Sequence, residues 1–328
     1  MPPKSKDEIE LKDVKFFLRD QLIKDKANLG HEESISGEAL EQPVVGYKLL
    51  DKLGSGGMSV VFKAEMMKTG KIVALKLLYP HHGKKALKQF LREGMILMCL
   101  DHPHILKGYD FGVSKGFYFL AMEFVEGESL YNFIKKGFLF SEFYTFQILL
   151  QIAQALEYLD ARKIVHRDIK PDNILMIADE VKLCDFGLAL DTSKQGQNES
   201  LDEFTCGTVE YISPEQARGN QNLDGRSDVY SLGITGLQMI TGQLPYHGSP
   251  QEIMRQQIYE PIVWEKFSKI SLTGQEIFKK MLAKQIEKRL TPSQLVVLLK
   301  ESLPTVSIFI LFLETSSSNL FLAKSPAQ

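Results

Sequence analysis

The 328-residue sequence lacks most features of secreted, membrane and nucleic-acid-binding proteins. Its three cysteines (Cys99, Cys184 and Cys206) lie far apart without metal-site spacing, which argues against a disulfide framework and suggests a reducing compartment. No apolar run reaches the roughly 18 to 20 residues that a membrane helix needs, and the polar N-terminus has no signal-like apolar core. The formal net charge of -2 gives no bulk attraction to nucleic acid or anionic membrane. These absences predict a cytoplasmic protein with no membrane span and no nucleic-acid partner.

Two motifs suited to phosphoryl transfer stand in the middle of the chain. The first, over 166–173, reads His-Arg-Asp-Ile-Lys-Pro-Asp-Asn, and the second, over 185–187, reads Asp-Phe-Gly. This chemistry needs a group that orients a hydroxyl, a cation beside the moving phosphoryl group, and oxygen or amide ligands for Mg²⁺. Segments 163–165 and 181–184 read as short buried strands that lead into the two motifs. We therefore expect both motif aspartates near strand ends, where the backbone fixes them.

A glycine-rich segment over 53–61 lies between two alternating stretches, 47–50 and 62–64. Alternation on both sides predicts a β-hairpin, whereas the loops of dinucleotide-binding and Walker sites open a helix. Glycine lets a backbone approach phosphate oxygens closely because no Cβ intervenes. The segment is therefore a candidate phosphate-covering loop.

Further strand and helix patterns surround these motifs. A buried-strand pattern over 72–76 ends in Lys76, a charge that needs a partner in a core, and Glu93 follows within a segment of helical periodicity over 84–100. Residues 117–122 read as another strand. The pattern over 141–162 predicts a long amphipathic helix. Its apolar stripe, which we interpret as core, consists of Ile148, Ile152, Leu156 and Leu159.

Taken in order, these motifs resemble the eukaryotic-type (Hanks-type) protein Ser/Thr kinases, and bacterial members in particular. Ser59 replaces the third glycine of the usual loop, as in the bacterial GxGGMSxV form. The resemblance covers 47–303 and implies an α+β, two-lobed fold, with a small β-rich N-lobe carrying one helix (47–125) and a larger, mainly helical C-lobe (126–303). Residues 1–46 would form an N-terminal extension and linker, and 304–328 a tail of unknown role.

The resemblance also implies a site for ATP and Mg²⁺. Lys76, paired with Glu93, would contact the α/β-phosphates, and backbone groups of Glu123 and Val125 would recognise adenine. Asn173 and Asp185 would bind Mg²⁺. The complete implied nucleotide-binding set is Leu53, Gly54, Ser55, Gly56, Gly57, Met58, Ser59, Val60, Val61, Ala74, Lys76, Glu93, Met122, Glu123, Val125, Leu175 and Asp185.

Three residues carry the implied catalysis: Asp168, Lys170 and Asn173. Asp168 would accept or orient the proton of the substrate hydroxyl, and Lys170 would contact the γ-phosphate. This lysine is typical of Ser/Thr kinases and usually absent from tyrosine kinases. His166 is expected to pack, together with Phe186 and Leu97, in a regulatory column.

The segment over 188–212 resembles an activation segment, in which Gly207-Thr208 would form the turn that docks the protein substrate. Ser213-Pro214-Glu215 stands for the Ala-Pro-Glu motif, and Glu215 is expected to pair with a buried Arg289. Asp228, near the start of the central helix of the large lobe, is expected to hold the backbone of the catalytic loop.

We expect autophosphorylation at Ser200 or Thr205, with the guanidinium of Arg167 binding the phosphate. A homodimer could serve this reaction. An amphipathic helix over 9–23 could dock on the small lobe or on a partner, or could belong to an extension that does little.

The expected function is therefore an ATP-dependent protein Ser/Thr kinase that transfers the γ-phosphate of Mg-ATP to Ser or Thr hydroxyls of protein substrates. One alternative is a pseudokinase scaffold, which the complete set of Lys76, Glu93, Asp168, Asn173 and Asp185 disfavours. The other is a small-molecule phosphotransferase, a class that lacks the peptide-docking segment near Thr208.

Overall fold

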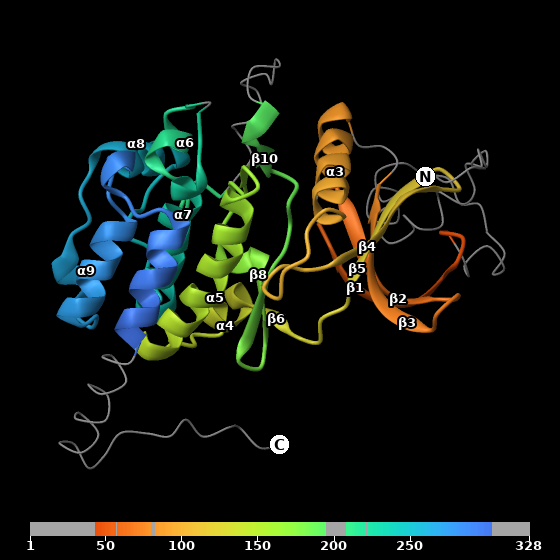
Figure 1. Ribbon diagram of the computed structural model, residues 1–328, viewed down its shortest axis with the longest axis horizontal. Helices are drawn as coiled ribbons and strands as arrows, with labels where there is room; N and C mark the ends of the chain where they lie inside the picture. The colour runs from red at the N-terminus through yellow and green to blue at the C-terminus, as the bar shows by residue number, and fades with distance from the viewer. Residues whose placement is uncertain (1–42, 57, 80–82, 195–207, 221, 304–328) are drawn as a thin grey trace, which may run out of the picture. The chain divides into compact units, whose positions relative to one another are not determined.

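A computed structural model describes residues 43–56, 58–79, 83–194, 208–220 and 222–303 (Figure 1). The chain divides into two compact units: Met1–Glu126 together with Cys184–Ala189, and Gly127–Leu183 together with Leu190–Gln328. The first is built on a β-sheet and the second is mostly helical, so the α+β class is confirmed. The expected tail and most of the expected N-terminal extension lie outside the described residues, so the domain boundaries stay a prediction. None of the helices in the described ranges is both long and apolar enough to cross a membrane.

The first unit contains a five-stranded antiparallel sheet in the order β1-β2-β3-β5-β4. Its strands are β1 (Tyr47–Ser55), β2 (Ser59–Met66), β3 (Lys71–Leu78), β4 (Gly108–Ser114) and β5 (Phe117–Glu123). The predicted hairpin is confirmed, because β1 and β2 pair directly on either side of the glycine cluster. The backbone N–H of Gly56 donates to the carbonyl of Ser59 at 2.8 Å and closes the turn.

Alternation along β3 explains the two faces of this sheet. Val73, Leu75 and Leu77 point into one apolar cluster, whereas Ala74 and Lys76 point to the opposite face. Because strands β2 and β5 flank β3 on both sides, the charged end of Lys76 is carried into the middle of the sheet. The cluster also contains Val44, Tyr47, Val60, Ala64, Tyr79, Phe117, Phe119 and Ala121.

Helix α3 (Lys84–Leu97) packs closely against β4 of the same unit. Gly94 makes the contact, and a Cβ at this position would stand 2.3 Å from the ring of Phe111. The helix ends three residues before the predicted Leu100. The N–H groups of Cys99 and Leu100 bond to carbonyls three residues back, which tightens the last turn, and Pro103 lies just beyond.

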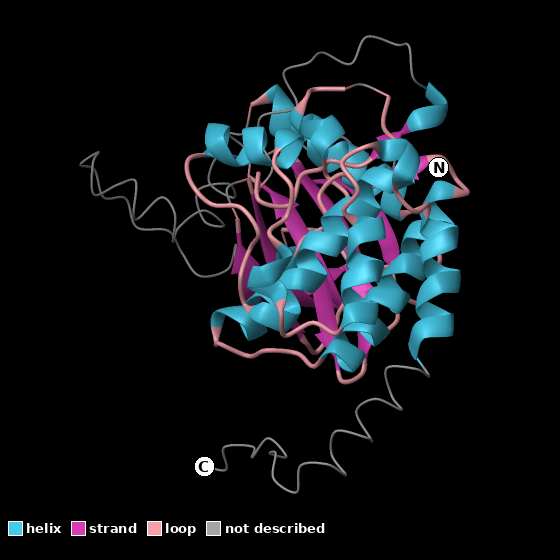
Figure 2. Cartoon of the chain, turned by 90° about the vertical axis from the view of Figure 1, so that its left-hand side faces the viewer, coloured by secondary structure: helices cyan, strands magenta, loops and turns pink. Residues whose placement is uncertain are grey.

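Helices make up most of the second unit (cyan in Figure 2). They are α4 (Leu130–Lys135), α5 (Glu142–Asp160), α6 (Pro214–Ala217), α7 (Gly225–Thr241), α8 (Pro250–Tyr259) and α9 (Leu272–Met281), followed by a helix over 292–303. The long helix predicted over 141–162 is α5, with Ser141 as its N-cap, since the side chain accepts the N–H of Tyr144. All four residues of its predicted stripe are buried.

Helix α7 crosses the core of this unit between α5 and α9. A Cβ at Gly236 would lie 2.8 Å from Phe278 of α9 and 2.9 Å from Leu149 of α5, so the glycine allows both neighbours to approach the helix backbone. This packing holds α7 in place, and α7 carries Asp228, whose contacts are described below.

Short strands complete the second unit. β6 (Glu128–Ser129), β8 (Ile174–Ile177) and β9 (Glu180–Leu183) form one sheet, and β7 (Ile164–Val165) pairs with β10 (Leu190–Asp191). The strands predicted over 163–165 and 181–184 correspond to β7, which begins one residue later than predicted, and to β9, which lies one residue earlier. As expected, the His-Arg-Asp motif directly follows a strand, and the Asp-Phe-Gly motif follows one closely.

Candidate active site

A buried ion pair joins β3 to α3 in the first unit. The Nζ atom of Lys76 lies 2.8 Å from Oε1 and 2.6 Å from Oε2 of Glu93, and both side chains are buried. Burial alone would lower the pKa of Lys76, but the carboxylate of Glu93 and then that of Asp185 raise it above its usual value. The lysine therefore stays protonated in the sheet, and the expectation that this charge has a partner is met. The strand itself runs two residues past Lys76, where the prediction had ended it.

Strand register gathers several predicted nucleotide-binding residues on one face of the sheet. Val61 is directly opposite Lys76, and Met122 is directly opposite Ala74. Opposite residues in antiparallel strands share a face, and so do residues two apart in one strand, so these four side chains project together. Val60 instead lies on the other face, buried in the apolar cluster. A role for Val60 at the nucleotide can therefore involve only its backbone.

The glycine-rich turn leaves open space around its backbone. A Cβ placed on Gly54 or Gly56 would meet nothing within 4 Å, so packing within the protein does not require glycine at either position. Leu53, Ser55 and the two glycines are exposed. Of the predicted loop residues, Gly57 lies outside the described residues. Glycines that the protein's own packing does not require are typical of a loop whose backbone a ligand approaches closely.

The predicted adenine-binding segment begins at Glu123, the last residue of β5. The N–H of Glu123 donates to the carbonyl of Lys107 at 2.8 Å, so a nucleotide could use Glu123 only through its carbonyl oxygen. Val125, two residues on, lies outside regular structure and is partly buried. Leu175, predicted for the same site, belongs to β8 of the second unit and is also partly buried.

The second unit brings the three predicted catalytic residues together. The Nζ of Lys170 lies 3.0 and 2.8 Å from the two carboxylate oxygens of Asp168. The Nδ2 of Asn173 donates to the carbonyl of Asp168 at 2.8 Å and to its Oδ2 at 2.9 Å. Pro171 is the first residue of the 3₁₀ turn η2 (Pro171–Asn173). The fixed φ of the proline helps the chain to turn back, so that Asn173 lies near Asp168. The carboxylate of Asp168 is thus held from two sides.

Asp228 supports the loop that carries Asp168. The N–H of His166 donates to its Oδ2 at 2.7 Å, and the N–H of Arg167 donates to its Oδ1 at 2.8 Å. Arg167 has a φ of 67°, a left-handed backbone that costs on the order of 1–3 kcal/mol for a residue other than glycine. Burial raises the pKa of Asp228 to about 7, and the two backbone hydrogen bonds oppose that rise. The expected support of the loop by Asp228 is confirmed.

The expected pair of Glu215 and Arg289 is also present. Nη1 of Arg289 lies 2.6 Å from Oε1 of Glu215, and Nη2 lies 3.0 Å from Oε2. The hydroxyl of Ser227 donates to Glu215 as well, at 2.6 Å. Burial would raise the pKa of Glu215, but the bidentate Arg289 and the Ser227 hydroxyl hold it below its usual value.

Gln216 is a supporting residue that the sequence analysis missed. Its Nε2 donates to the carbonyl of Arg167 at 2.9 Å, while its Oε1 accepts from Ser213 in a capping box at the start of α6. The Ser-x-x-Gln spacing was a visible signal for the cap. The second bond, to a residue 49 positions earlier, has no signature in the sequence.

Asp185 belongs to the first unit, near the buried pair of Lys76 and Glu93. It has a φ of 63°, and its Oδ1 accepts the N–H of Gly187 at 3.3 Å. No cluster of three or more His, Cys, Asp or Glu side chains suited to a metal occurs in the described ranges. Mg²⁺ in phosphoryl-transfer sites needs only one or two protein ligands, because phosphates and waters supply the rest. The carboxylate of Asp185 in the first unit is a ligand of this kind, and so, in the second unit, is the amide oxygen of Asn173; their joint use of one ion stays a prediction.

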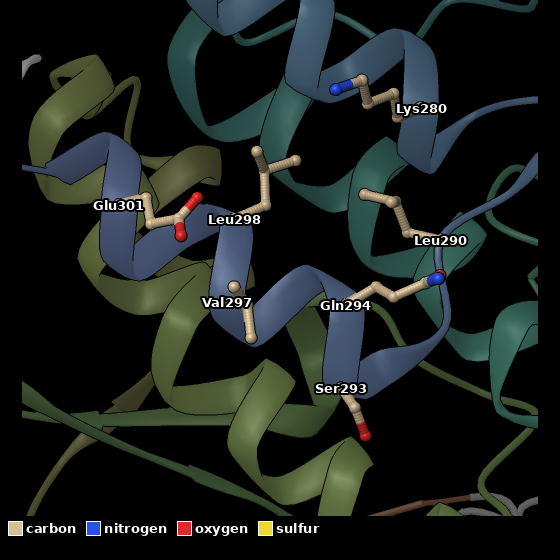
Figure 3. A pocket seen from close by; sticks show the side chains of 7 residues that line it. All are labelled: Lys280, Leu290, Ser293, Gln294, Val297, Leu298 and Glu301. Atoms are coloured by element: carbon tan, nitrogen blue, oxygen red, sulfur yellow. The ribbon is translucent and has the colours of Figure 1, made fainter.

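One pocket of about 410 Å³ opens on the second unit (Figure 3). Its walls come from α9, from the segment after it, and from the helix over 292–303. The lining residues are Lys280, Leu290, Ser293, Gln294, Val297, Leu298 and Glu301. None of the predicted catalytic or nucleotide-binding residues is among them.

Comparison with known proteins identifies the fold family. The family model described as protein kinase domain matches residues 47–298, most of the chain. The chain belongs to the protein kinase domain family. Ser/Thr-protein kinase pkn3 of Myxococcus xanthus is 37% identical over 212 residues, covering 61% of this chain and 38% of that protein. PrkC of Bacillus subtilis is 36% identical over 205 residues (62% and 31%), and PknA of Corynebacterium glutamicum is 34% identical over 227 (66% and 48%). The chain spans less than half the length of these relatives.

The resemblance to bacterial Ser/Thr kinases is therefore confirmed. Other kinase features stay predictions. His166, Phe186 and Leu97 are each buried, as a regulatory column requires, but their stacking is untested. Thr208 is partly buried, and its expected bond near Asp168 also remains a prediction. The helix predicted over 9–23, the turn residue Gly207 and the expected phosphorylation sites Ser200 and Thr205 lie outside the described residues.

Proposed function

We propose that this chain is an ATP-dependent protein Ser/Thr kinase, acting on Ser or Thr hydroxyls of protein substrates. The observation that carries the proposal is the arrangement around Asp168, whose carboxylate is bonded by both Lys170 and Asn173. An exposed surface aspartate has no need of such support. A carboxylate fixed in this way can orient one hydroxyl with little reorganisation, which is the main requirement of a loose phosphoryl-transfer transition state.

In the proposed reaction, the substrate hydroxyl attacks the γ-phosphorus of ATP, the bond from that phosphorus to the β,γ-bridging oxygen breaks, and ADP leaves. Asp168 orients the hydroxyl and takes its proton. Lys170 offsets negative charge on the transferring group. Lys76, held by Glu93, binds the α/β-phosphates, and its raised pKa keeps it charged for that role. Asn173 and Asp185 would hold Mg²⁺, which supplies neutralisation of the phosphate oxygens.

Two other functions are less well supported. A pseudokinase scaffold need not keep Asp168 bonded to both Lys170 and Asn173, nor Lys76 paired with Glu93. A small-molecule phosphotransferase would have no use for the peptide-docking segment that follows Thr208. Both alternatives predict no phosphate on protein Ser or Thr.

The direct test supplies γ-labelled Mg-ATP and a generic basic protein, followed by acid hydrolysis and separation of the phosphorylated amino acids. Label in phosphoserine or phosphothreonine is the expected result. Label confined to phosphotyrosine would contradict the proposal. In a parallel reaction with a cell extract, label confined to small molecules would contradict it as well. Omission of Mg²⁺ should abolish transfer.

We also expect the kinase to phosphorylate itself at Ser200 or Thr205, with Arg167 engaging the phosphate. Mass spectrometry of the chain after incubation with Mg-ATP would locate the modification. Absence of phosphate between residues 190 and 208 in an otherwise active enzyme would refute this expectation. A rate per molecule that rises with enzyme concentration would support reaction between two copies of the chain.

A further inference from the structure

Lys284 is a partly buried cation with no role in the proposed mechanism. It follows α9, and its Nζ donates to the hydroxyl of Tyr230 at 2.8 Å and to the carbonyl of Gln257 at 2.7 Å. The same atom lies 4.5 Å from the centre of the Tyr246 ring. Burying a lysine is costly unless its donors are satisfied. The site is therefore built to hold an ammonium group on three neighbouring segments.

The hydrogen bonds continue from Tyr230 to the segment near Thr208. The hydroxyl of Tyr230 donates to Oε1 of Gln257 at 2.6 Å, and Nε2 of Gln257 donates to the carbonyl of Glu210 at 2.7 Å. Tyr230 and Gln257 are both fully buried, so water cannot replace these bonds. Lys284, Tyr230, Gln257 and Glu210 form one relay.

Charge on Lys284 fixes the direction of this relay. An ammonium group can only donate hydrogen bonds, so the Tyr230 hydroxyl must accept one from Lys284. The hydroxyl then donates its own hydrogen bond to Oε1 of Gln257. That choice leaves Nε2 of Gln257 facing the carbonyl of Glu210. A neutral amine at Lys284 could instead accept a hydrogen bond from the Tyr230 hydroxyl. The Gln257 amide could then turn over so that its Nε2 donates to Tyr230, and its Oε1 would face the carbonyl of Glu210. The last bond of the relay would then be lost.

The relay ends in the segment that follows the predicted activation segment. The N–H of Tyr211 donates to the carbonyl of Thr208 at 3.2 Å, and its hydroxyl donates to Gln238 of α7 at 2.6 Å. The carbonyl of Glu210 is thus the second anchor of residues 208–211. We propose that Lys284 is a positioning residue that, through this relay, holds 208–211 in the shape that docks the protein substrate. The inference rests on the proposed kinase function.

The kinetic test compares Lys284→Met with Lys280→Met, a matched change at an exposed lysine of α9. Loss of one buried hydrogen bond should raise KM for the protein substrate about 5- to 10-fold in Lys284→Met. KM for ATP should stay within about 2-fold, because the relay does not reach Lys76 or Glu93, and Lys280→Met should match the wild type. Equal changes in the two KM values, or no change in either, would overturn the inference.

A pH profile separates positioning from a merely structural contribution. Burial, and then the positive charges of Arg289 and Arg218, lower the pKa of Lys284 to about 7, while Glu260 opposes the shift. Tyr230 and Tyr246, the other titratable neighbours, have raised pKa values and stay neutral in this range. KM for the protein substrate should rise in the wild type as the pH increases through about 7. Lys284→Arg keeps the charge and should flatten the profile, and a slope shared by both proteins would contradict the inference.

Hydrogen exchange tests the relay without any kinase activity. Amide exchange across 208–212 should be at least several-fold faster in Lys284→Met than in the wild type or in Lys280→Met, whereas exchange in α5 should be unaffected. Unchanged exchange there would refute the relay. If the wild type transfers no phosphate but the exchange result holds, the kinase proposal fails and the positioning of 208–211 by Lys284 stands.

Discussion

At the scale of single residues, Asp228 holds the predicted catalytic loop through a carboxylate that must accept two backbone N–H groups at once. Asparagine offers only one acceptor at this position and would turn an NH₂ group toward the second N–H. A protonated Asp228 has the same defect. Both forms should let the loop drift from the geometry that presents Asp168.

We therefore predict that Asp228→Asn lowers kcat about 10-fold at pH 8, the equivalent of one buried hydrogen bond. Burial raises the pKa of Asp228 to about 7, so the Asp228 carboxyl of the wild type is itself protonated at pH 6. The ratio of the wild-type kcat to the Asp228→Asn kcat should therefore fall toward 1 at that pH. Steady-state kinetics across this range measure the ratio, with Asp51→Asn at an exposed position of β1 as control. A ratio that does not change with pH would contradict the account.

The buried pair of Glu215 and Arg289 gives a second prediction at this scale. Arg289→Met leaves the carboxylate of Glu215 buried without its partner and should reduce the free energy of unfolding by about 3–5 kcal/mol. Arg255→Met, which breaks an exposed pair with Glu260, should cost no more than about 1 kcal/mol. Urea denaturation compares the two variants. Adding Glu215→Gln to Arg289→Met should recover part of the loss, and a further loss would show that the pair is not the source.

At the scale of elements, α3 depends on its close approach to β4 at Gly94. Gly94→Ala places a Cβ against the ring of Phe111, so the helix must move or the ring must turn. We predict a loss of about 1–3 kcal/mol in the free energy of unfolding and a raised KM for ATP, because Glu93 is the neighbouring residue. Gly83→Ala, where a Cβ meets nothing within 4 Å, serves as control.

A double variant checks the cause of that loss. If the clash with Phe111 is responsible, Gly94→Ala should cost little in a Phe111→Ala background, where the ring is gone. Calorimetric melting of the four proteins gives the coupling. If Gly94→Ala reduces stability equally with and without Phe111→Ala, the loss arises within helix α3 and not from the contact with Phe111.

Most elements could be predicted from sequence because their signals are local. Alternation located the paired strands beside the glycine cluster, and the stripe of Ile148, Ile152, Leu156 and Leu159 located α5. Helix ends were less predictable, as α3 shows, since two of the residues after Leu97 bond to carbonyls three residues back, a change that the apolar pattern does not reveal. Val60 was assigned to the nucleotide site together with Val61, but neighbouring strand residues face opposite ways, and only the register shows which face is which.

At the scale of the whole molecule, the order of motifs was enough to predict the kinase family, and the match over 47–298 confirms it. The supports of the candidate site were harder to predict. Gln216 reaches Arg167 across 49 positions, and Lys284 reaches Tyr230 across 54. Such bonds join residues that no local pattern connects, and each residue taken alone reads as an ordinary polar side chain. Asp168, Lys170 and Asn173 were predictable because they lie within six consecutive residues.

The central claim is that Asp168, held by Lys170 and Asn173, orients the hydroxyl that receives the phosphate. The most direct test is the single-turnover rate of γ-phosphate transfer in the wild type and in Asp168→Asn, with ATP affinity measured in parallel. Asp179→Asn, an exposed change in the turn between β8 and β9, is the control. We predict a rate about 10²- to 10⁴-fold lower in Asp168→Asn with ATP affinity unchanged. Transfer at the wild-type rate in Asp168→Asn would contradict the account.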